Sequence, residues 1–170
     1  MILKRILVYL LGKFINYDSI SDRFPISVKS LIFDNKRFLL LKNERDEWDL
    51  PGGKIEKNES IIETLVREVK EESNVRIDNY RIFLANKYIF REQEIIVVVY
   101  FSKITNDDPI SLSFENLEYD FFSYDKIHQL KLTPWAKDSL DEFKSQFEFS
   151  DIAVKNQDIW SRYVVSAYGD

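Results

Sequence analysis

The stretch that most constrains this chain runs from Leu50 to Val75 and reads LPGGKIEKNESIIETLVREVKEESNV. It begins with Pro51-Gly52-Gly53, which holds two of the chain's four glycines. A glycine pair in so glycine-poor a chain predicts a turn where the backbone bends or approaches another group. A helix-forming segment follows from Ser60 to Ser73, and its apolar residues recur at the helical period and define a buried side. These residues are Ile62, Leu65, Val66 and Val69.

Three carboxylates gather beside that buried side, near the end of the predicted helix. At about 100° of rotation per residue, Glu68, Glu71 and Glu72 fall within an arc of roughly 100°. Like charges at these spacings destabilise a helix by roughly 0.2–0.5 kcal/mol per pair, and the helix dipole disfavours anions near the C-terminus. The cluster therefore implies a counter-charge, and oxygen ligands at this spacing suit Mg²⁺ or Mn²⁺. A solvated acidic face is the alternative, because glutamate is a good helix former.

The spacing around these glutamates resembles the box of the Nudix hydrolases. That box is Gly, five residues of any kind, Glu, seven of any kind, and then Arg-Glu-apolar-any-Glu-Glu-any-Gly-apolar. The chain matches it from Gly53 through Glu59 to the run Arg67–Val75, with one departure: Asn74 stands where the family has Gly. That glycine ends the helix in a left-handed conformation, which Asn tolerates best among the other residues. The departure therefore preserves the cap and leaves every charged position intact.

The resemblance implies a fold and an activity. The fold is an α/β/α sandwich with a mixed β-sheet, whose active site lies at the glycine turn and the box helix. The activity is hydrolysis of a phosphoanhydride bond in a small nucleoside diphosphate derivative, either a nucleoside triphosphate, including a damaged one, or an ADP-sugar. A non-catalytic nucleotide-sensing module on the same fold is the alternative. Sensors can lose box glutamates, so the four that this chain keeps favour an enzyme; they are Glu59, Glu68, Glu71 and Glu72.

The resemblance also implies which residues hold the metal. Glu68 and Glu72, one helical turn apart, are the expected ligands of Mg²⁺ or Mn²⁺. Glu71 is expected to be a further ligand or to assist the attacking water. The backbone carbonyl of Gly52 is expected to complete the site, as is common in the family.

The remaining candidates concern the substrate and the general base. Arg67 and Lys54 are the candidate substrate-binding residues; for Arg67 we favour a structural role holding a carboxylate, and for Lys54 a solvated side chain is an equal alternative. The early-helix Glu59 is expected to be structural too. Family members take the base either from the box or from a later loop. Here the loop candidate is Glu115, with Glu118 as second choice.

Composition limits the classes of function. The 170 residues suit one domain with a full core, and the net charge of −5 argues against binding a nucleic-acid polymer. The absence of cysteine excludes disulfides and thiolate metal sites, and the single histidine, His128, excludes a histidine-rich zinc site. A cytoplasmic metal–carboxylate protein acting on a small nucleotide fits these limits.

We expect three regions in the chain. Residues 1–23 hold an amphipathic helix over Met1–Ile15 and a connection, residues 24–148 form the catalytic domain, and residues 149–170 form an extension packed on the domain or on a dimer partner. We expect the first helix to pack on its own domain or on a twin subunit. Because it is basic, an interfacial membrane helix is the lesser alternative.

Within the central region, alternating and continuous apolar runs predict strands. We expect a hairpin from residues 25–33 and 37–41, a strand over about 80–90, a buried central strand over 94–104 and a strand over 117–124. A short turn is expected over 125–130, and Thr133-Pro134 predicts the start of a last helix, with Thr133 as its N-cap. Core packing is expected for Trp48 and, with base stacking as the alternative, for five other aromatic residues: Phe24, Tyr88, Phe90, Trp135 and Trp160.

Overall fold

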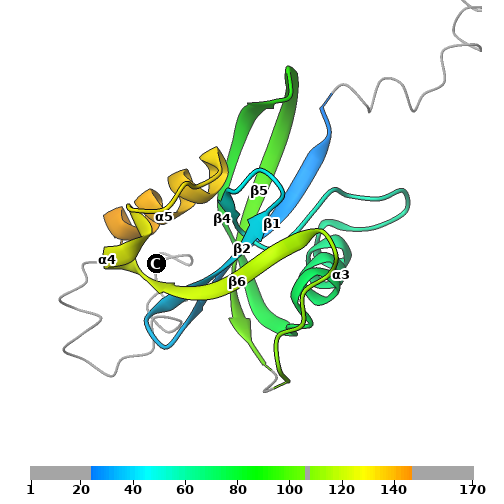
Figure 1. Cartoon of the computed structure of the whole chain (residues 1–170). Helices are drawn as coiled ribbons and strands as arrows, with labels where there is room; N and C mark the ends of the chain where they lie inside the picture. The colour runs from blue at the N-terminus through cyan, green and yellow to red at the C-terminus, as the bar shows by residue number, and fades with distance from the viewer. Residues whose placement is uncertain (1–23, 106–107, 147–170) are drawn as a thin grey trace, which may run out of the picture.

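The computed structural model describes residues 24–105 and 108–146 (Figure 1). The helix predicted over Met1–Ile15, the extension predicted over 149–170 and Trp160 lie outside the described residues. The elements in chain order are β1 (Ile26–Asp34), β2 (Arg37–Asn43), β3 (Trp48–Asp49), α3 (Ile61–Ser73), β4 (Ile77–Phe90), β5 (Gln93–Ile104), β6 (Asn116–Ser123), α4 (Tyr124–Ile127) and α5 (Pro134–Gln146).

The strands form a six-stranded mixed sheet in the order β3-β2-β1-β5-β4, with β6 paired to β2. The predicted hairpin is present, since β1 and β2 pair antiparallel at Phe33↔Phe38. β1 runs parallel to β5, from Ile26↔Ile96 to Ile32↔Ser102. β5 also pairs antiparallel with β4, so it lies inside the sheet, as its apolar run predicts.

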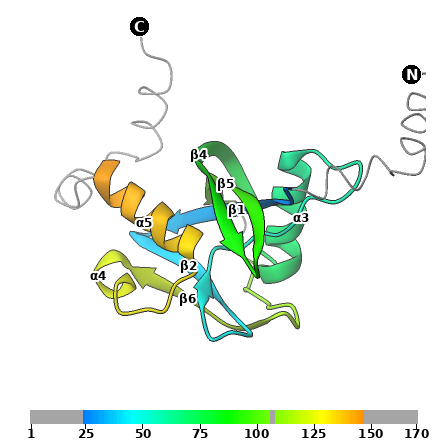
Figure 2. The same ribbon diagram turned by 90° about the horizontal axis from the view of Figure 1, so that it is seen from above.

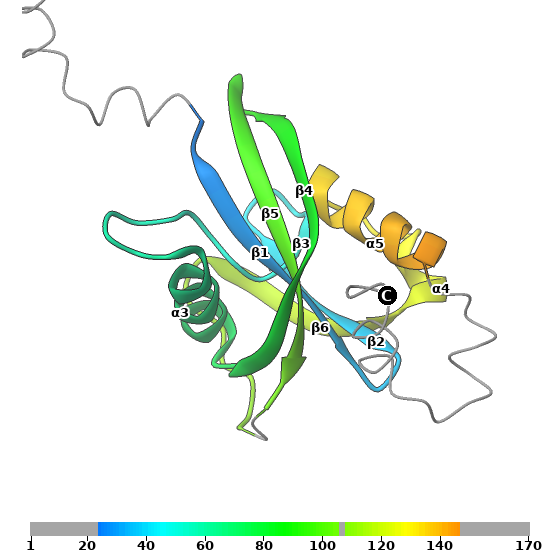
Figure 3. The same cartoon turned by 180° about the vertical axis from the view of Figure 1, so that it is seen from behind.

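Helices cover both faces of the sheet. α3 lies on one side, and α4 and α5 lie on the other, in all three views of the molecule (Figures 1, 2 and 3). Under α3, Leu65 and Val69 are buried against Val28 of β1. On the opposite face, Phe143 of α5 meets Phe38 edge-on with ring centroids 4.9 Å apart. The predicted α/β/α sandwich with a mixed sheet is therefore confirmed.

Both ends of α3 carry specific caps. The Ser60 side chain accepts the N–H of Glu63, and the Glu63 carboxylate accepts the N–H of Ser60, which is a complete capping box. At the other end Asn74 adopts a left-handed conformation with φ of 62°, and its N–H donates to the carbonyl of Lys70 at 2.9 Å. The prediction that Asn replaces the usual glycine cap is confirmed.

Two elements differ from the sequence-based expectation. β4 begins at Ile77 rather than near residue 80, because its pairing with β5 shifts register between Asp78 and Arg81 and so breaks the alternation. The turn expected over 125–130 is wrong in part, since Tyr124–Ile127 form the short helix α4. The predicted start of α5 is confirmed: Thr133 directly precedes Pro134, and its carbonyl accepts the N–H of Lys137 at 2.9 Å, while its hydroxyl donates to Asp49 at 2.8 Å.

Candidate active site

The glycine turn is fastened to the middle strand of the sheet. The N–H of Val28 donates to the carbonyl of Gly53, and the N–H of Ser30 donates to the carbonyl of Pro51, each at 2.8 Å. Gly52 has a φ of 130°, and a Cβ there would lie 2.2 Å from the carbonyl oxygen of Val28. Only glycine fits this close backbone approach, which is the reason for glycine at position 52.

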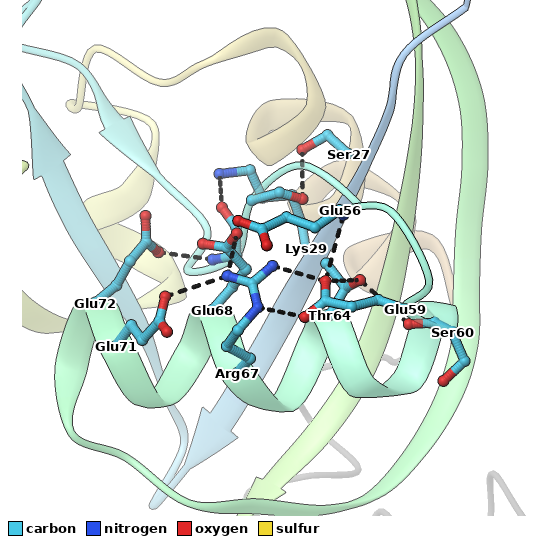
Figure 4. Close-up of polar contacts among 12 residues, drawn as sticks. Ser27, Lys29, Glu56, Glu59, Ser60, Thr64, Arg67, Glu68, Glu71 and Glu72 are labelled. Carbon is cyan, nitrogen blue, oxygen red and sulfur yellow. Dashed lines mark hydrogen bonds and ion pairs between the residues drawn. The ribbon is translucent and has the colours of Figure 1, made fainter. Parts of the chain in front are cut away.

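Glu68 and Glu72 both face this turn from α3 (Figure 4). A Glu72 oxygen accepts the N–H of Gly52 at 2.7 Å. The Glu68 carboxylate occupies the space beside Gly53, where a Cβ would stand only 2.4 Å from it. Burial raises the pKa of Glu68, against the opposing effect of Arg67. Burial also raises the pKa of Glu72, against the opposing effect of Lys29. Both charged carboxylates would therefore be stabilised by an added cation.

Arg67 contacts the carboxylates around it. Its Nε and Nη2 donate to the two oxygens of Glu59 at 2.6 and 2.8 Å, and its Nη1 donates to Glu68 at 2.8 Å and to Glu71 at 3.1 Å. The bidentate contact with Arg67 lowers the pKa of Glu59 to about 2. These contacts are those expected of an arginine that holds neighbouring carboxylates in place. Glu71 lies at the outer side of the group, with a side chain 61% exposed.

Lys29, which the sequence analysis did not single out, contacts the turn directly. Its Nζ donates to Asp49 Oδ2 at 3.0 Å and to the carbonyl oxygen of Gly52, which was the backbone group predicted to bind metal. Burial acts to lower the pKa of Lys29, but Asp49, Glu72 and Glu68 outweigh it, so the pKa lies above its usual value. A lysine within the apolar run of β1 was the available signal, because lysine is rarely buried unless it is paired.

A cavity of about 680 Å³ opens beside the turn. Its lining includes Lys29, Glu72 and the exposed Lys54, together with the rings of Phe90 and Trp135. Tyr88 and Phe24 do not line this cavity: the Tyr88 hydroxyl donates to Asp138 at 2.9 Å, and Phe24 is 44% exposed. Trp48 packs edge-on against Phe122, as expected of a packing residue.

The loop that carries Glu115 is held beside the end of α3. The N–H of Ser113 donates to the carbonyl of Glu72 at 3.2 Å, and the N–H of Ser111 donates to the carbonyl of Ser73 at 3.1 Å. Glu115 is exposed and lines the same cavity as Glu72. The second candidate, Glu118, instead forms an ion pair with Lys42 at 3.2 Å.

The donor set suits a magnesium-like ion that shares its shell with a substrate. Within residues 24–105 and 108–146, no three Asp, Glu or His side chains stand close enough to hold a metal ion by themselves. Glu68 and Glu72 nevertheless supply two carboxylates beside one turn. Mg²⁺ is commonly bound through one or two carboxylates, with water and phosphate oxygens completing its shell. The residues present therefore fit such an ion, with Glu71 placed further out than expected.

Comparison with known proteins identifies the family. The model of the NUDIX domain matches residues 23–143. The chain is 31% identical to the MutT protein of Methanosarcina mazei Go1, over 72% of this chain and 94% of that one, with a TM-score of 0.65. A NUDIX hydrolase of Nitrosomonas europaea is 19% identical over 72% of this chain and 90% of its own, with a TM-score of 0.66, and shows the same fold. The chain belongs to the NUDIX family.

A curated relative is similar over a shorter stretch. The 8-oxo-dGTP diphosphatase of Buchnera aphidicola subsp. Schizaphis graminum is 37% identical over 60 residues, which are 35% of this chain and 43% of the relative. The match thus spans less than half of that relative's length. In the described part of the chain, none of the helices has the length and apolar character needed to cross a membrane.

Proposed function

We propose that this protein is a divalent-metal-dependent pyrophosphohydrolase that cleaves a phosphoanhydride bond in a small nucleoside diphosphate derivative. The observation that carries the proposal is the convergence of Glu68 and Glu72 on the glycine turn. Glu72 also lines the cavity of about 680 Å³ beside that turn. Membership in the NUDIX family supports it. Two partly buried carboxylates that favour an added cation suit a site that binds a metal together with a polyanionic substrate.

In this proposal each residue has a separate task. Glu68 and Glu72 hold Mg²⁺ or Mn²⁺ beside the turn. When bound, the ion offsets the charge of the phosphate oxygens and lowers the pKa of the attacking water. Arg67 keeps Glu68 in position through its contacts with Glu59 and Glu68. Glu71, the outermost carboxylate, assists from the solvent side.

We assign the general base to Glu115. Its loop is hydrogen-bonded to the last turn of α3, so its carboxylate belongs to the same cavity as Glu72 while staying exposed to water. A carboxylate at this place in the cavity can accept a proton from the water that attacks the phosphorus. The second phosphate then leaves with the electrons of the cleaved P–O bond.

For the substrate we propose a nucleoside triphosphate, with a damaged one such as 8-oxo-dGTP first, because a curated relative is an 8-oxo-dGTP diphosphatase. Phe90 and Trp135 offer ring surfaces in the cavity for a base, and the exposed Lys54 at the turn offers a charge for a phosphate. An ADP-sugar is the alternative.

The test is a panel of nucleoside triphosphates, 8-oxo-dGTP and ADP-sugars with Mg²⁺, in which phosphate, pyrophosphate and monophosphate are each measured. We expect pyrophosphate and nucleoside monophosphate from the preferred triphosphate. Glu72→Gln should abolish the reaction, whereas Glu63→Gln, on the same helix but in its N-terminal cap, should not change it. Turnover that is equal with and without a metal chelator would refute the proposal.

A further inference from the structure

Lys29 places a fixed positive charge at the glycine turn. Its ammonium group is the hydrogen-bond donor to the Gly52 carbonyl and lies 3.0 Å from Asp49 Oδ2. Lys29 is only 8% exposed and lines the cavity together with Glu72. Figure 4 shows the side chains of Lys29 and Glu72 both reaching the glycine turn.

Asp49 does not depend on Lys29 alone for its hydrogen bonds. Its Oδ1 accepts the N–H of Leu50 at 2.7 Å and the hydroxyl of Thr133 at 2.8 Å, and it also accepts the indole N–H of Trp135. A neutral side chain at position 29 would therefore leave Asp49 with three donors. Among the described side chains, Lys29 is the one that donates to the Gly52 carbonyl.

We propose that the ammonium group of Lys29 occupies the Gly52 carbonyl and thereby restricts a bound divalent ion to Glu68 and Glu72. This inference rests on the proposed function. An ammonium group at the carbonyl repels a second cation at the same oxygen, and the low dielectric of a buried site strengthens that repulsion. Lys29 is thus a positioning residue, which acts on the metal through the turn.

The consequence is a metal site that is weak without substrate. Glu68 and Glu72 alone supply few ligands. The positive charge of Lys29 beside them also repels the metal ion. Phosphate oxygens of the nucleotide complete the shell, so binding of the ion and of the nucleotide reinforce each other. Removing the charge of Lys29 should release the Gly52 carbonyl as a further ligand and strengthen metal binding by the free protein.

The experiment measures Mn²⁺ binding to the free protein, without nucleotide, from the electron paramagnetic resonance signal of unbound Mn²⁺. Lys29→Met should bind Mn²⁺ about tenfold or more tightly than the wild type. Lys29→Arg, which keeps the charge, should bind like the wild type. Lys54→Met is the matched control: it removes an exposed lysine from the same turn and should change the affinity by less than about threefold, because water screens its charge.

Thermal unfolding checks that each variant is folded. Where Lys29→Met does not fold, the double variant Lys29→Met/Asp49→Asn removes both charges of the pair and carries the same expectation. Unchanged or weaker Mn²⁺ binding by the folded charge-free variant would overturn this inference alone. Absence of Mn²⁺ binding by every variant, with nucleotide present as well, would overturn the proposed metal-dependent function together with it.

Discussion

Replacing Gly53 by Ala tests whether the place of the Glu68 carboxylate matters for the reaction. The added Cβ would stand 2.4 Å from the carboxylate carbon of Glu68. Carbon atoms pack at about 3.5 Å or more, so the carboxylate has to retreat by about 1 Å. A displacement of about 1 Å at a reacting centre can cost about 100-fold in rate, or about 2.7 kcal/mol of barrier.

The same substitution should hardly affect folding. The atoms in its way belong to the end of a flexible side chain, and Gly53 is not among the residues with a positive φ. We expect the free energy of unfolding to change by less than about 1 kcal/mol, because replacing glycine at a compatible position also restricts the unfolded chain.

Gly52→Ala is the matched comparison one residue away. Its Cβ would lie 2.2 Å from the backbone oxygen of Val28, which cannot swing aside, and its φ of 130° is strained for alanine. Backbone strain of this kind costs about 1–3 kcal/mol, so this variant should unfold at lower urea concentration. Urea unfolding and nucleotide turnover of both variants separate the two effects. Gly53→Ala with more than about a tenth of the wild-type kcat would refute the reasoning about Glu68.

Three further predictions concern the general base, the packing of the core and the dependence of stability on pH in acid. Glu115→Gln should lower turnover at saturating Mg²⁺ by more than about tenfold, roughly 1.4 kcal/mol of barrier, and a smaller loss would remove Glu115 from the mechanism. Phe143→Ala should cost about 3–5 kcal/mol in urea unfolding, because this ring is fully buried among other aromatic rings; a cost below about 1 kcal/mol would contradict that packing. Arg67 holds the pKa of Glu59 at about 2 against 4.5 unpaired, so this pair stabilises the fold fully above pH 4.5 and loses its effect as the pH falls through about 2. The difference in unfolding free energy between wild type and Glu59→Gln should shrink over that window, and a constant difference would refute the assignment.

Much of the fold followed from local patterns. The helix α3 carries its own start signal in a capping box at Ser60 and its own end signal in Asn74, so its limits could be predicted to within a residue. The hairpin of β1 and β2 was predictable because two apolar runs flank a short polar turn. β4 was harder, because a register shift near Asp78 displaces the side-chain alternation that marks a strand.

The candidate site was predictable where its members are neighbours in sequence. Glu68 and Glu72 share one helix, so their periodicity alone places them together. Lys29 is 23 residues from Gly52 and lies on β1, and only the hydrogen bonds between β1 and the folded turn bring its ammonium to Gly52. The periodicity of residues along a helix or a strand does not predict such a contact. The charge of lysine within an apolar strand was the single available signal.

The central claim is that Glu68 and Glu72 hold a divalent cation in front of the glycine turn. The most direct measurement is an anomalous difference map from crystals soaked with Mn²⁺ and a non-hydrolysable nucleoside triphosphate. We predict a manganese peak between these two carboxylates that also touches phosphate oxygens, with Lys29 still on the Gly52 carbonyl. A map without a peak there, with Glu68 still paired to Arg67 and Glu72 still on the N–H of Gly52, would contradict the account.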